Sequence, residues 1–257
     1  MRVRLIFFLF MASFALYASE KQDAELPSYQ KLLKDALAKK KKRELPAEVI
    51  KVMKTAEENL KKQMPTPGLS EGMIAPDFTL INQNGKMINL YQLLSKNPVI
   101  LNFYRGSWCM YCSLELKMLK KATRSIEELG GVILSISPQT LKKVKEQTTK
   151  NNFPFSILSD PRAKIAKSYG LYFELETKLE KLYKEKFNLD IASFNDKGHL
   201  GLPVPATFVI GQNKEVLACF ADIDYEKRME VKDILKALKK NVKTTSKRRD
   251  RKQSEAY

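Results

Sequence analysis

The stretch Leu101-Asn-Phe-Tyr-Arg-Gly-Ser-Trp-Cys109-Met-Tyr-Cys112-Ser-Leu-Glu-Leu joins an apolar run to a helical pattern through a short turn. Residues 99–104 are typical of a buried β-strand, and the helical pattern begins at the cysteines. A helix N-terminus carries unpaired N–H groups and the positive end of the helix dipole, which stabilise a thiolate. The stretch therefore predicts a strand that leads into a helix with a Cys-X-X-Cys pair in its first turn.

Cys109 and Cys112 are the residues that we expect to be catalytic, as a redox-active disulfide pair. A spacing of three in a helix places both sulfurs on one face, close enough for a disulfide of normal geometry. At a helix N-terminus the pKa of the outer thiol of such a pair falls from ~8.5 to roughly 3.5–7. Arg105 is predicted to support the pair with its charge if it points inward, and Trp108 to extend an apolar docking surface beside it.

Two other uses of these cysteines are disfavoured. A structural zinc site needs four Cys or His ligands, and only Cys219 and His199 remain in the chain. A purely structural disulfide that closes so short a loop adds little stability. We therefore expect no metal and no other cofactor. Cys219 lies in an apolar strand-like segment and is interpreted as a buried inert thiol, with a second resolving role as the alternative.

The composition is that of a globular protein with a basic surface. Of the 257 residues, 44% are hydrophobic and 29% are charged, and the formal net charge is +17. Such an excess gives a self-repelling surface with a loose affinity for polyanions. The basic residues form no aromatic-interleaved face and no nucleic-acid recognition motif, so we expect no nucleic-acid partner.

Residues 1–18 are predicted to be a signal peptide. Arg2 and Arg4 precede a run without charge, and small residues at its end permit cleavage. The run is shorter than the roughly 20 residues that span a membrane, so we expect no stable membrane insertion after cleavage. The protein is then periplasmic or secreted, in an oxidising compartment, with an uncleaved membrane anchor as the alternative.

Residues 19–66 are predicted to form a helical N-terminal arm, and 242–257 a basic disordered tail. The arm has two amphipathic helices, over 28–43 and from Pro46 onward, and the segment Pro65-Thr-Pro67-Gly68 ends it. The tail is rich in lysine and arginine and lacks apolar periodicity.

Strands and helices alternate in the remaining domain, residues 70–241. Strands are predicted over 78–81, 87–90, 99–104, 132–137, 155–158, 207–210 and 216–220. Helices are predicted over 109–129, 141–150, 163–169, 175–187 and 231–240, and residues 195–201 are predicted to be a loop. This order predicts an α/β fold with a partly parallel sheet and an antiparallel last pair of strands.

Three blocks give the domain a family resemblance: Gly72-Met-Ile-Ala-Pro-Asp-Phe-Thr-Leu, Ile100-Leu-Asn-Phe-Tyr and Leu202-Pro-Val-Pro-Ala-Thr-Phe-Val-Ile. They resemble the alkyl hydroperoxide reductase/thiol-specific antioxidant (AhpC/TSA) family, peroxiredoxin-like proteins of the thioredoxin superfamily. The resemblance implies a thioredoxin-like fold, with a central mixed sheet flanked by helices and extended by the two-helix arm. It also implies that Pro205 is the cis-proline facing the cysteines, with an ordinary loop proline as the alternative.

The activity implied by the resemblance is that of a thiol-dependent peroxidase. The implied substrates are hydrogen peroxide or organic hydroperoxides, and the implied electron donor is a dithiol such as a thioredoxin-like protein. A thiol-disulfide oxidoreductase acting on protein thiols is the alternative function, and a non-enzymatic adaptor is a third hypothesis.

The sequence departs from the family at its active site. Typical peroxiredoxins carry Pro-X-X-X-Thr-X-X-Cys and a distant arginine that together polarise the peroxide. In that register Arg105 replaces the proline, Cys109 replaces the threonine and Cys112 takes the position of the attacking cysteine. Thioredoxin chemistry assigns the attack to Cys109 instead, so the sequence leaves the roles of the cysteines open. No residue is assigned as the distant arginine of the family; Arg228 is interpreted as a surface arginine, with a feature particular to this branch of the family as the alternative.

Overall fold

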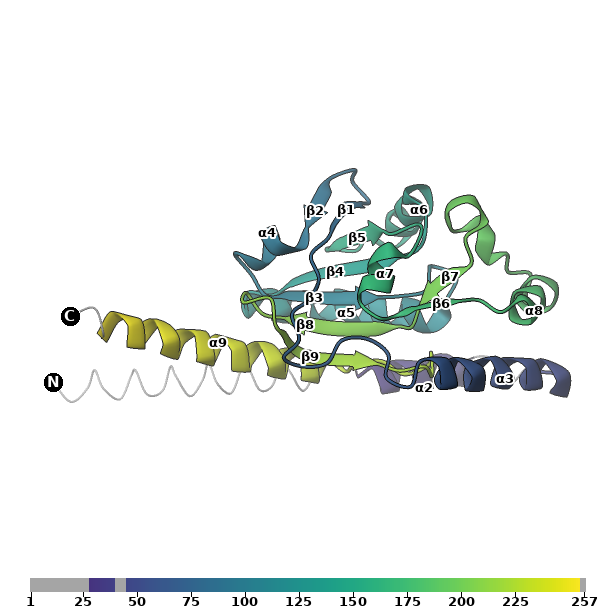
Figure 1. Ribbon diagram of the computed structural model, residues 1–257, viewed down its shortest axis with the longest axis horizontal. Coiled ribbons are helices and arrows are strands. Elements are labelled where there is room, and N and C mark those ends of the chain that lie inside the picture. The colour runs from purple at the N-terminus through teal and green to yellow at the C-terminus, as the bar shows by residue number, and fades with distance from the viewer. Residues whose placement is uncertain (1–27, 40–44, 255–257) are drawn as a thin grey trace.

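The structure is a computed structural model that describes residues 28–39 and 45–254. The predicted signal peptide, residues 1–18, lies outside these described residues. Within them, one sheet has seven strands in the order β2-β1-β5-β4-β3-β8-β9 (Figure 1). The strands are β1 (Thr79–Asn82), β2 (Met87–Asn89), β3 (Val99–Phe103), β4 (Val132–Ser137), β5 (Ser156–Ser159), β8 (Ala206–Ile210) and β9 (Val216–Ala221).

The sheet is mixed, as the alternating pattern predicted. β3, β4 and β5 are parallel neighbours, and β8 lies antiparallel on the other side of β3. The hairpins β1–β2 and β8–β9 are antiparallel, as their short loops predicted. Gly85 in the first hairpin has a φ of +80°, which favours glycine over residues with a Cβ.

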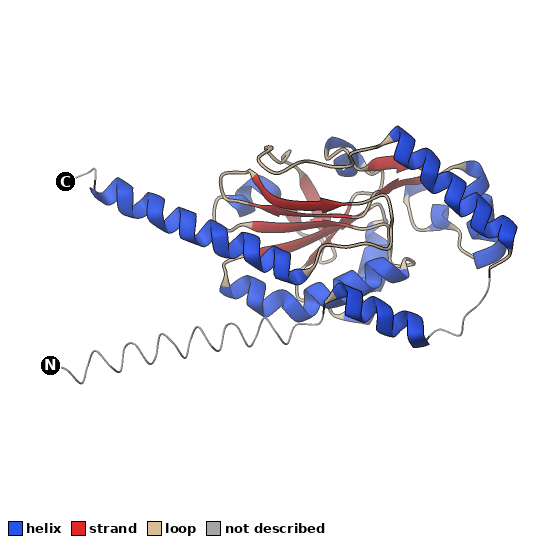
Figure 2. Cartoon of the chain, turned by 90° about the horizontal axis from the view of Figure 1, so that it is seen from below, coloured by secondary structure: helices blue, strands red, loops and turns tan. Residues whose placement is uncertain are grey.

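Helices cover both faces of the sheet (Figure 2). The helices are α4 (Leu90–Leu94), α5 (Met110–Glu128), α6 (Leu141–Asn151), α7 (Lys164–Ser168) and α9 (Val231–Ser254). Ile100 on β3 packs in the apolar cluster that contains the buried side chains of α5, α6 and α9. Its neighbour Leu101 packs in the cluster that contains those of α4 and α7. This alternation follows from the period of two in a strand.

The N-terminal arm packs directly on the domain. Its helices are α2 (Tyr29–Lys39) and α3 (Ala47–Gln63), and the end of the predicted first helix, residues 40–44, lies outside the described chain. Tyr29 is completely buried, and its hydroxyl donates a hydrogen bond to the carbonyl of Glu226 at 2.7 Å. Val49 of α3 belongs to a third apolar cluster with Leu182 of α8 (Thr177–Phe187).

The segment between α7 and β8 contains the predicted helix over 175–187, which is α8, and two short strands that the sequence analysis did not predict. In the described chain β6 (Tyr172–Glu174) pairs with β7 (Gly201–Pro203) in a small antiparallel sheet. Between them follow α8 and the 3-10 turns η1 (Ile191–Ser193) and η2 (Asp196–Gly198). The loop prediction over 195–201 is therefore only partly correct. Three residues show no alternating pattern, and β6 and β7 lack the Asn-Gly turn that reveals the equally short β2, so the sequence did not reveal them.

Two further expectations need correction. The last helix was predicted to end near Lys240, but α9 continues to Ser254, so the predicted disordered tail is helical over 242–254. This segment contains neither glycine nor proline, and lysine, arginine and glutamine favour a helix even without an apolar face. Residues 255–257 lie outside the described chain.

The prediction of a cis-proline at Pro205 is wrong, because no peptide bond in the described residues is cis. Pro205 joins β7 to β8, and the amide of Val204 just before it donates to the carbonyl of Leu171 at 2.8 Å. A trans bond, the lower-energy form by about 0.5–1 kcal/mol, is sufficient for this extended connection. In the same described part of the chain, we find no helix that is both long and apolar enough to cross a membrane.

Candidate active site

The turn between β3 and α5 is held in one conformation. Gly106 has a φ of +154°, and a Cβ at this position would collide with the indole nitrogen of Trp108. The backbone N–H and the hydroxyl of Ser107 both donate to Oε1 of Gln139, at 2.8 and 2.7 Å. Glycine therefore allows the backbone to lie close to the indole, and the two hydrogen bonds from Ser107 to Gln139 fix the position at which α5 begins.

Cys109 is the N-cap residue of α5, as the strand–turn–helix pattern predicted. Its Sγ accepts a hydrogen bond from the backbone N–H of Cys112 at 3.4 Å. The Sγ of Cys112 lies 2.7 Å away and donates to it, and both cysteines are free thiols. Cys109 also lines an open groove of about 340 Å³, together with Met110 and Phe187. Cys112 is completely buried behind it.

Arg105 is buried and points toward the cysteines. Its Nη2 donates to Sγ of Cys109 at 3.4 Å, and its guanidinium lies 4.3 Å from the ring centroid of Tyr225. Trp108 is partly buried, with its ring 5.2 Å from the guanidinium and 6.4 Å from the ring of Tyr183. The aromatic rings thus hold a cation beside the outer sulfur.

Arg228 is a site residue that the sequence analysis misjudged. The interpretation as a surface arginine is wrong, because Arg228 is only 4% exposed. Its Nη2 donates to Sγ of Cys112 at 3.1 Å, and its Nε donates to Oε2 of Glu115 at 2.6 Å. Glu115 follows Cys112 by three residues and lies on the same buried face of α5. A buried carboxylate needs a positively charged partner, so this glutamate was the sequence signal for an arginine or lysine from another part of the chain.

Glu115 is the other site residue that the sequence analysis missed. It is 1% exposed and accepts hydrogen bonds from Arg228 and from the hydroxyl of Thr207 on β8, the latter at 3.1 Å. Burial raises the pKa of its carboxyl group, although the charge of Arg228 and these hydrogen bonds oppose that rise. Glu115 is therefore a buried acid that is linked to Cys112 through Arg228.

The two thiols have opposite pKa shifts. Burial raises the pKa of Cys109, but the hydrogen bond from Cys112 and the charges of Arg105 and Arg228 outweigh it, so the pKa lies well below that of an ordinary cysteine. Burial, the hydrogen bond to Cys109 and the charge of the Cys109 thiolate raise the pKa of Cys112 well above it. The geometry therefore favours Cys109 as the attacking thiolate, the choice that the sequence left open.

The remaining candidate residues lie apart from the sulfurs. Pro205 lines a cavity next to the groove, together with Arg105 and Tyr225. Cys219 on β9 is partly buried and packs with the apolar cluster on the opposite face of the sheet from Cys109. The interpretation as a fully buried thiol is therefore not borne out, although its partial burial raises the pKa of the thiol.

Comparison with known proteins is consistent with this geometry. Residues 72–218 match the model of the AhpC/TSA family. The chain is 34% identical over 106 residues to "Putative peroxiredoxin bcp" of Haemophilus influenzae, covering 41% of this chain and 68% of that protein. It is 29% identical over 107 residues to "Peroxiredoxin Q, chloroplastic" of Triticum aestivum, and the match spans 42% of this chain and about half, 49%, of the wheat protein.

Solved structures show the same fold. Peroxidoxin BcpB from Mycobacterium tuberculosis superimposes with a TM-score of 0.53 at 22% identity, over 66% of this chain and 97% of that one. A cysteine-to-serine mutant of PrxQ from Xylella fastidiosa gives a TM-score of 0.53 at 15% identity, over 69% and 99% of the two chains. These similarities confirm the thioredoxin-like architecture.

We predict that the Cys109 thiol is alkylated by iodoacetamide at a pH where an ordinary thiol is mostly protonated. Its lowered pKa keeps the thiolate populated above that pKa, so the rate rises early in a pH series and then levels off. Arg105→Met raises this pKa, so the rise in rate moves to higher pH, and at a pH below both pKa values the rate falls about tenfold for each unit of the increase in pKa. Rates are measured in a Cys219→Ser background, with mass spectrometry to locate the label.

The matched control is Arg124→Met, which removes an exposed arginine of α5. An Arg105→Met profile that overlays the Arg124→Met profile would show that Arg105 does not set the reactivity of Cys109.

Proposed function

Because this chain belongs to the AhpC/TSA family, we propose that it is a thiol-dependent peroxidase that reduces hydrogen peroxide or organic hydroperoxides through Cys109 and Cys112. The observation that carries the proposal is the pairing of an outer cysteine of lowered pKa, beside Arg105 at an open groove, with a protonated cysteine 2.7 Å behind it. This arrangement supplies both a nucleophile and a resolving thiol.

In the first step the Cys109 thiolate attacks the terminal oxygen of the peroxide. An S–O bond forms, the O–O bond breaks, and the sulfur is oxidised to a sulfenic acid while the leaving oxygen becomes hydroxide or alkoxide. That oxygen takes a proton from solvent. The guanidinium of Arg105 lies beside the reacting sulfur and stabilises the negative charge as it moves to the leaving oxygen. We infer that Arg105, although it stands at the proline position of the motif, takes over the peroxide-polarising role that the threonine has in typical peroxiredoxins.

In the second step Cys112 attacks the sulfenic sulfur of Cys109. A disulfide forms, and the sulfenic oxygen leaves as water with the proton of the Cys112 thiol. The raised pKa of Cys112 makes this deprotonation the difficult part. The guanidinium of Arg228 contacts the sulfur of Cys112 and stabilises its thiolate as the proton leaves, and Glu115 holds that guanidinium in place. A dithiol donor then reduces the Cys109–Cys112 disulfide and completes the cycle.

A second candidate function is thiol-disulfide exchange with protein substrates in the periplasm. The observation that favours it is the groove, because its apolar lining of Trp108, Met110, Phe187 and Leu189 suits a peptide segment next to Cys109. Both functions use Cys109 as the attacking sulfur and Cys112 as the resolving one.

We further propose that the protein is exported to the periplasm or secreted, and that a membrane-linked thiol relay supplies its electrons. The support is the predicted signal peptide, residues 1–18. We expect the mature protein in the soluble periplasmic fraction of cells that express it, with an N-terminus near residue 19. A protein that retains Met1 in the cytosolic fraction would contradict export.

We expect that the Cys112→Ser variant consumes about one equivalent of peroxide and accumulates a sulfenic acid on Cys109, because the attacking thiolate remains and the resolving thiol is lost. Cys109→Ser should form no such adduct, and the double variant should consume peroxide only at the background rate. The stoichiometry of peroxide loss and the trapping with dimedone and mass spectrometry are measured without a reductant, and the turnover of the double variant is compared with that of wild type in the presence of a dithiol.

A sulfenic acid trapped on Cys112 in Cys109→Ser would reverse the assigned roles. Reduced insulin, assayed with the same preparations, separates the two functions. Exchange with insulin and no consumption of peroxide would favour the oxidoreductase.

A Glu115→Gln variant should slow disulfide formation at least about tenfold and leave sulfenic acid formation near the wild-type rate, because Arg228 is then held less firmly beside Cys112, whose thiolate it stabilises. Stopped-flow fluorescence of Trp108, the only tryptophan, follows the two phases separately. The matched control is Glu127→Gln, an exposed acid on the same helix. Two phases slowed by the same factor would indicate that Glu115 only maintains the structure.

A further inference from the structure

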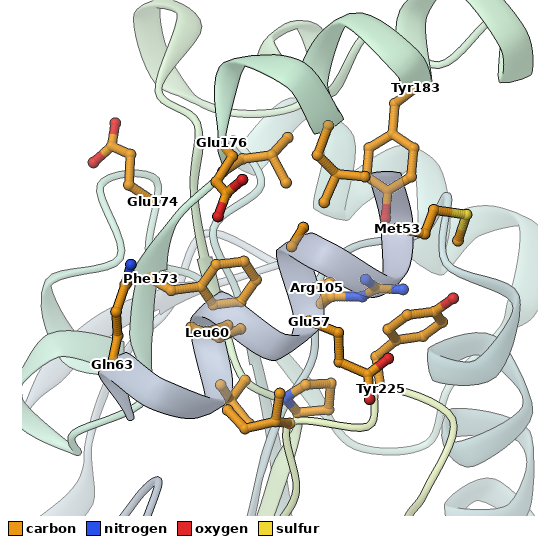
Figure 3. A pocket seen from close by; sticks show the side chains of 16 residues that line it. Met53, Glu57, Leu60, Gln63, Arg105, Phe173, Glu174, Glu176, Tyr183 and Tyr225 are labelled. Atoms are coloured by element: carbon orange, nitrogen blue, oxygen red, sulfur yellow. The ribbon is translucent and has the colours of Figure 1, made fainter. Parts of the chain in front are cut away.

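One short segment, residues 225–230, holds the two arginines of the site in place. Its first residue, Tyr225, places its ring centroid 4.3 Å from the guanidinium of Arg105, and Figure 3 shows the two side chains next to each other. Three residues further on, Arg228 donates to Sγ of Cys112 at 3.1 Å. A shift of this segment would move the charges beside both sulfurs, so the contacts that fix it matter for the chemistry of the site.

The first helix of the N-terminal arm, α2, fixes this segment. The hydroxyl of Tyr29 donates to the carbonyl of Glu226 at 2.7 Å. The backbone N–H groups of Tyr29 and Gln30 donate to the two carboxylate oxygens of Glu230, at 2.8 and 3.1 Å. The free N–H groups at the start of a helix favour such a carboxylate. The arm is thereby bonded to the segment on both sides of Arg228.

The side chain of Tyr29 also lies against the redox centre itself. It is completely buried in the apolar cluster that contains Cys109 and Cys112, and its ring centroid lies 5.9 Å from the guanidinium carbon of Arg228. A guanidinium within about 6 Å of an aromatic ring is attracted to the face of that ring. Burial raises the pKa of Tyr29, so its hydroxyl keeps the proton that it donates to Glu226.

We propose that Tyr29 is a positioning residue of the redox centre, which holds Arg228 beside Cys112 and thereby sets the rate at which the sulfenic acid on Cys109 is resolved. The inference rests on the proposed peroxidase function. Tyr29 and Arg228 both lie outside residues 72–218, the part of the chain that matches the family model. The contact between them therefore joins the arm to the segment before α9, beyond the part that the family model describes.

The step that Tyr29 supports is the attack of Cys112 on the sulfenic sulfur of Cys109. Cys112 gives up its proton, the S–S bond forms and the S–O bond breaks, and the oxygen leaves as water with that proton. The guanidinium of Arg228 stabilises the thiolate that this attack requires. A guanidinium that drifts away from the sulfur leaves less thiolate at a given pH, and the step becomes slower.

The rate of this step depends on pH through Cys112. Burial, the hydrogen bond to Cys109 and the charge of Cys109 raise the pKa of Cys112, whereas Arg228 and Arg105 lower it. The groups that face Cys112 or Arg228 from the elements packed around them are Cys109 and Glu115 on α5, Arg105 on the turn before it, Tyr104 directly after β3, and Tyr29 on α2. Loss of the contact with Tyr29 should therefore raise the pKa of Cys112 through Arg228.

The test is a Tyr29→Leu variant, which removes the ring and the hydroxyl from beside Arg228. We expect disulfide formation at pH 7 to slow at least about tenfold and the midpoint of its pH profile to move up by about one unit, since one pKa unit is a tenfold change in the thiolate population. Formation of the sulfenic acid should stay near the wild-type rate, because Arg105 still contacts Cys109. Rapid quenching followed by mass spectrometry times both products over a series of pH values.

The matched control is Leu33→Ala, which weakens the packing of α2 one turn away in the same apolar cluster and should keep the wild-type midpoint. Tyr29→Phe keeps the test decisive if Tyr29→Leu folds poorly. It retains the ring and removes the hydrogen bond to Glu226. We expect it to slow disulfide formation about fivefold, the effect of one ordinary hydrogen bond.

The outcomes separate this inference from the function on which it rests. A Tyr29→Leu midpoint equal to that of Leu33→Ala would overturn the positioning role while the peroxidase stands. Where Tyr29→Leu does not fold, disulfide formation at the wild-type rate in Tyr29→Phe would overturn it. A wild-type protein that forms neither a sulfenic acid nor a disulfide with peroxide would overturn the proposed function itself.

Discussion

The buried ion pair between Glu115 and Arg228 holds the inner part of the site together. The two side chains are 2% and 1% exposed and meet at 2.6 Å. A charge at such depth is tolerated only with a partner, and removal of either one costs about 3–5 kcal/mol. The pair joins α5 to the segment before α9, and the hydrogen bond from Thr207 adds β8. This ion pair positions the guanidinium of Arg228 beside the sulfur of Cys112.

Only one of the two sulfurs in the site carries a negative charge. At a separation of 2.7 Å a second thiolate would be strongly repelled by the first, so one thiol ionises and the other keeps its proton. Cys109 takes the charge because it caps α5, accepts the N–H of Cys112 and contacts Arg105. The arrangement therefore separates a thiolate at the groove from a protonated thiol behind it.

Elements with a regular pattern were predictable, and the others were not. β4 was predicted residue for residue, because six apolar-rich residues between turns allow few alternatives. The three-residue strands β6 and β7 carry too little pattern, and the basic end of α9 is helical by propensity without an apolar face. The cis-proline expectation at Pro205 came from family resemblance, and the local backbone accommodates the trans bond.

The sequence by itself determined the strand, the turn and the helix that begins at Cys109, because these depend on neighbouring residues and on the glycine of the turn. Only the tertiary structure decided that Arg105 contacts the sulfur of Cys109 and Arg228 that of Cys112. Arg228 reaches Cys112 across 116 residues of chain, and no local pattern encodes such a contact. The cavity beside Arg105 likewise exists only where the arm and α8 meet, because two segments distant in sequence form its walls.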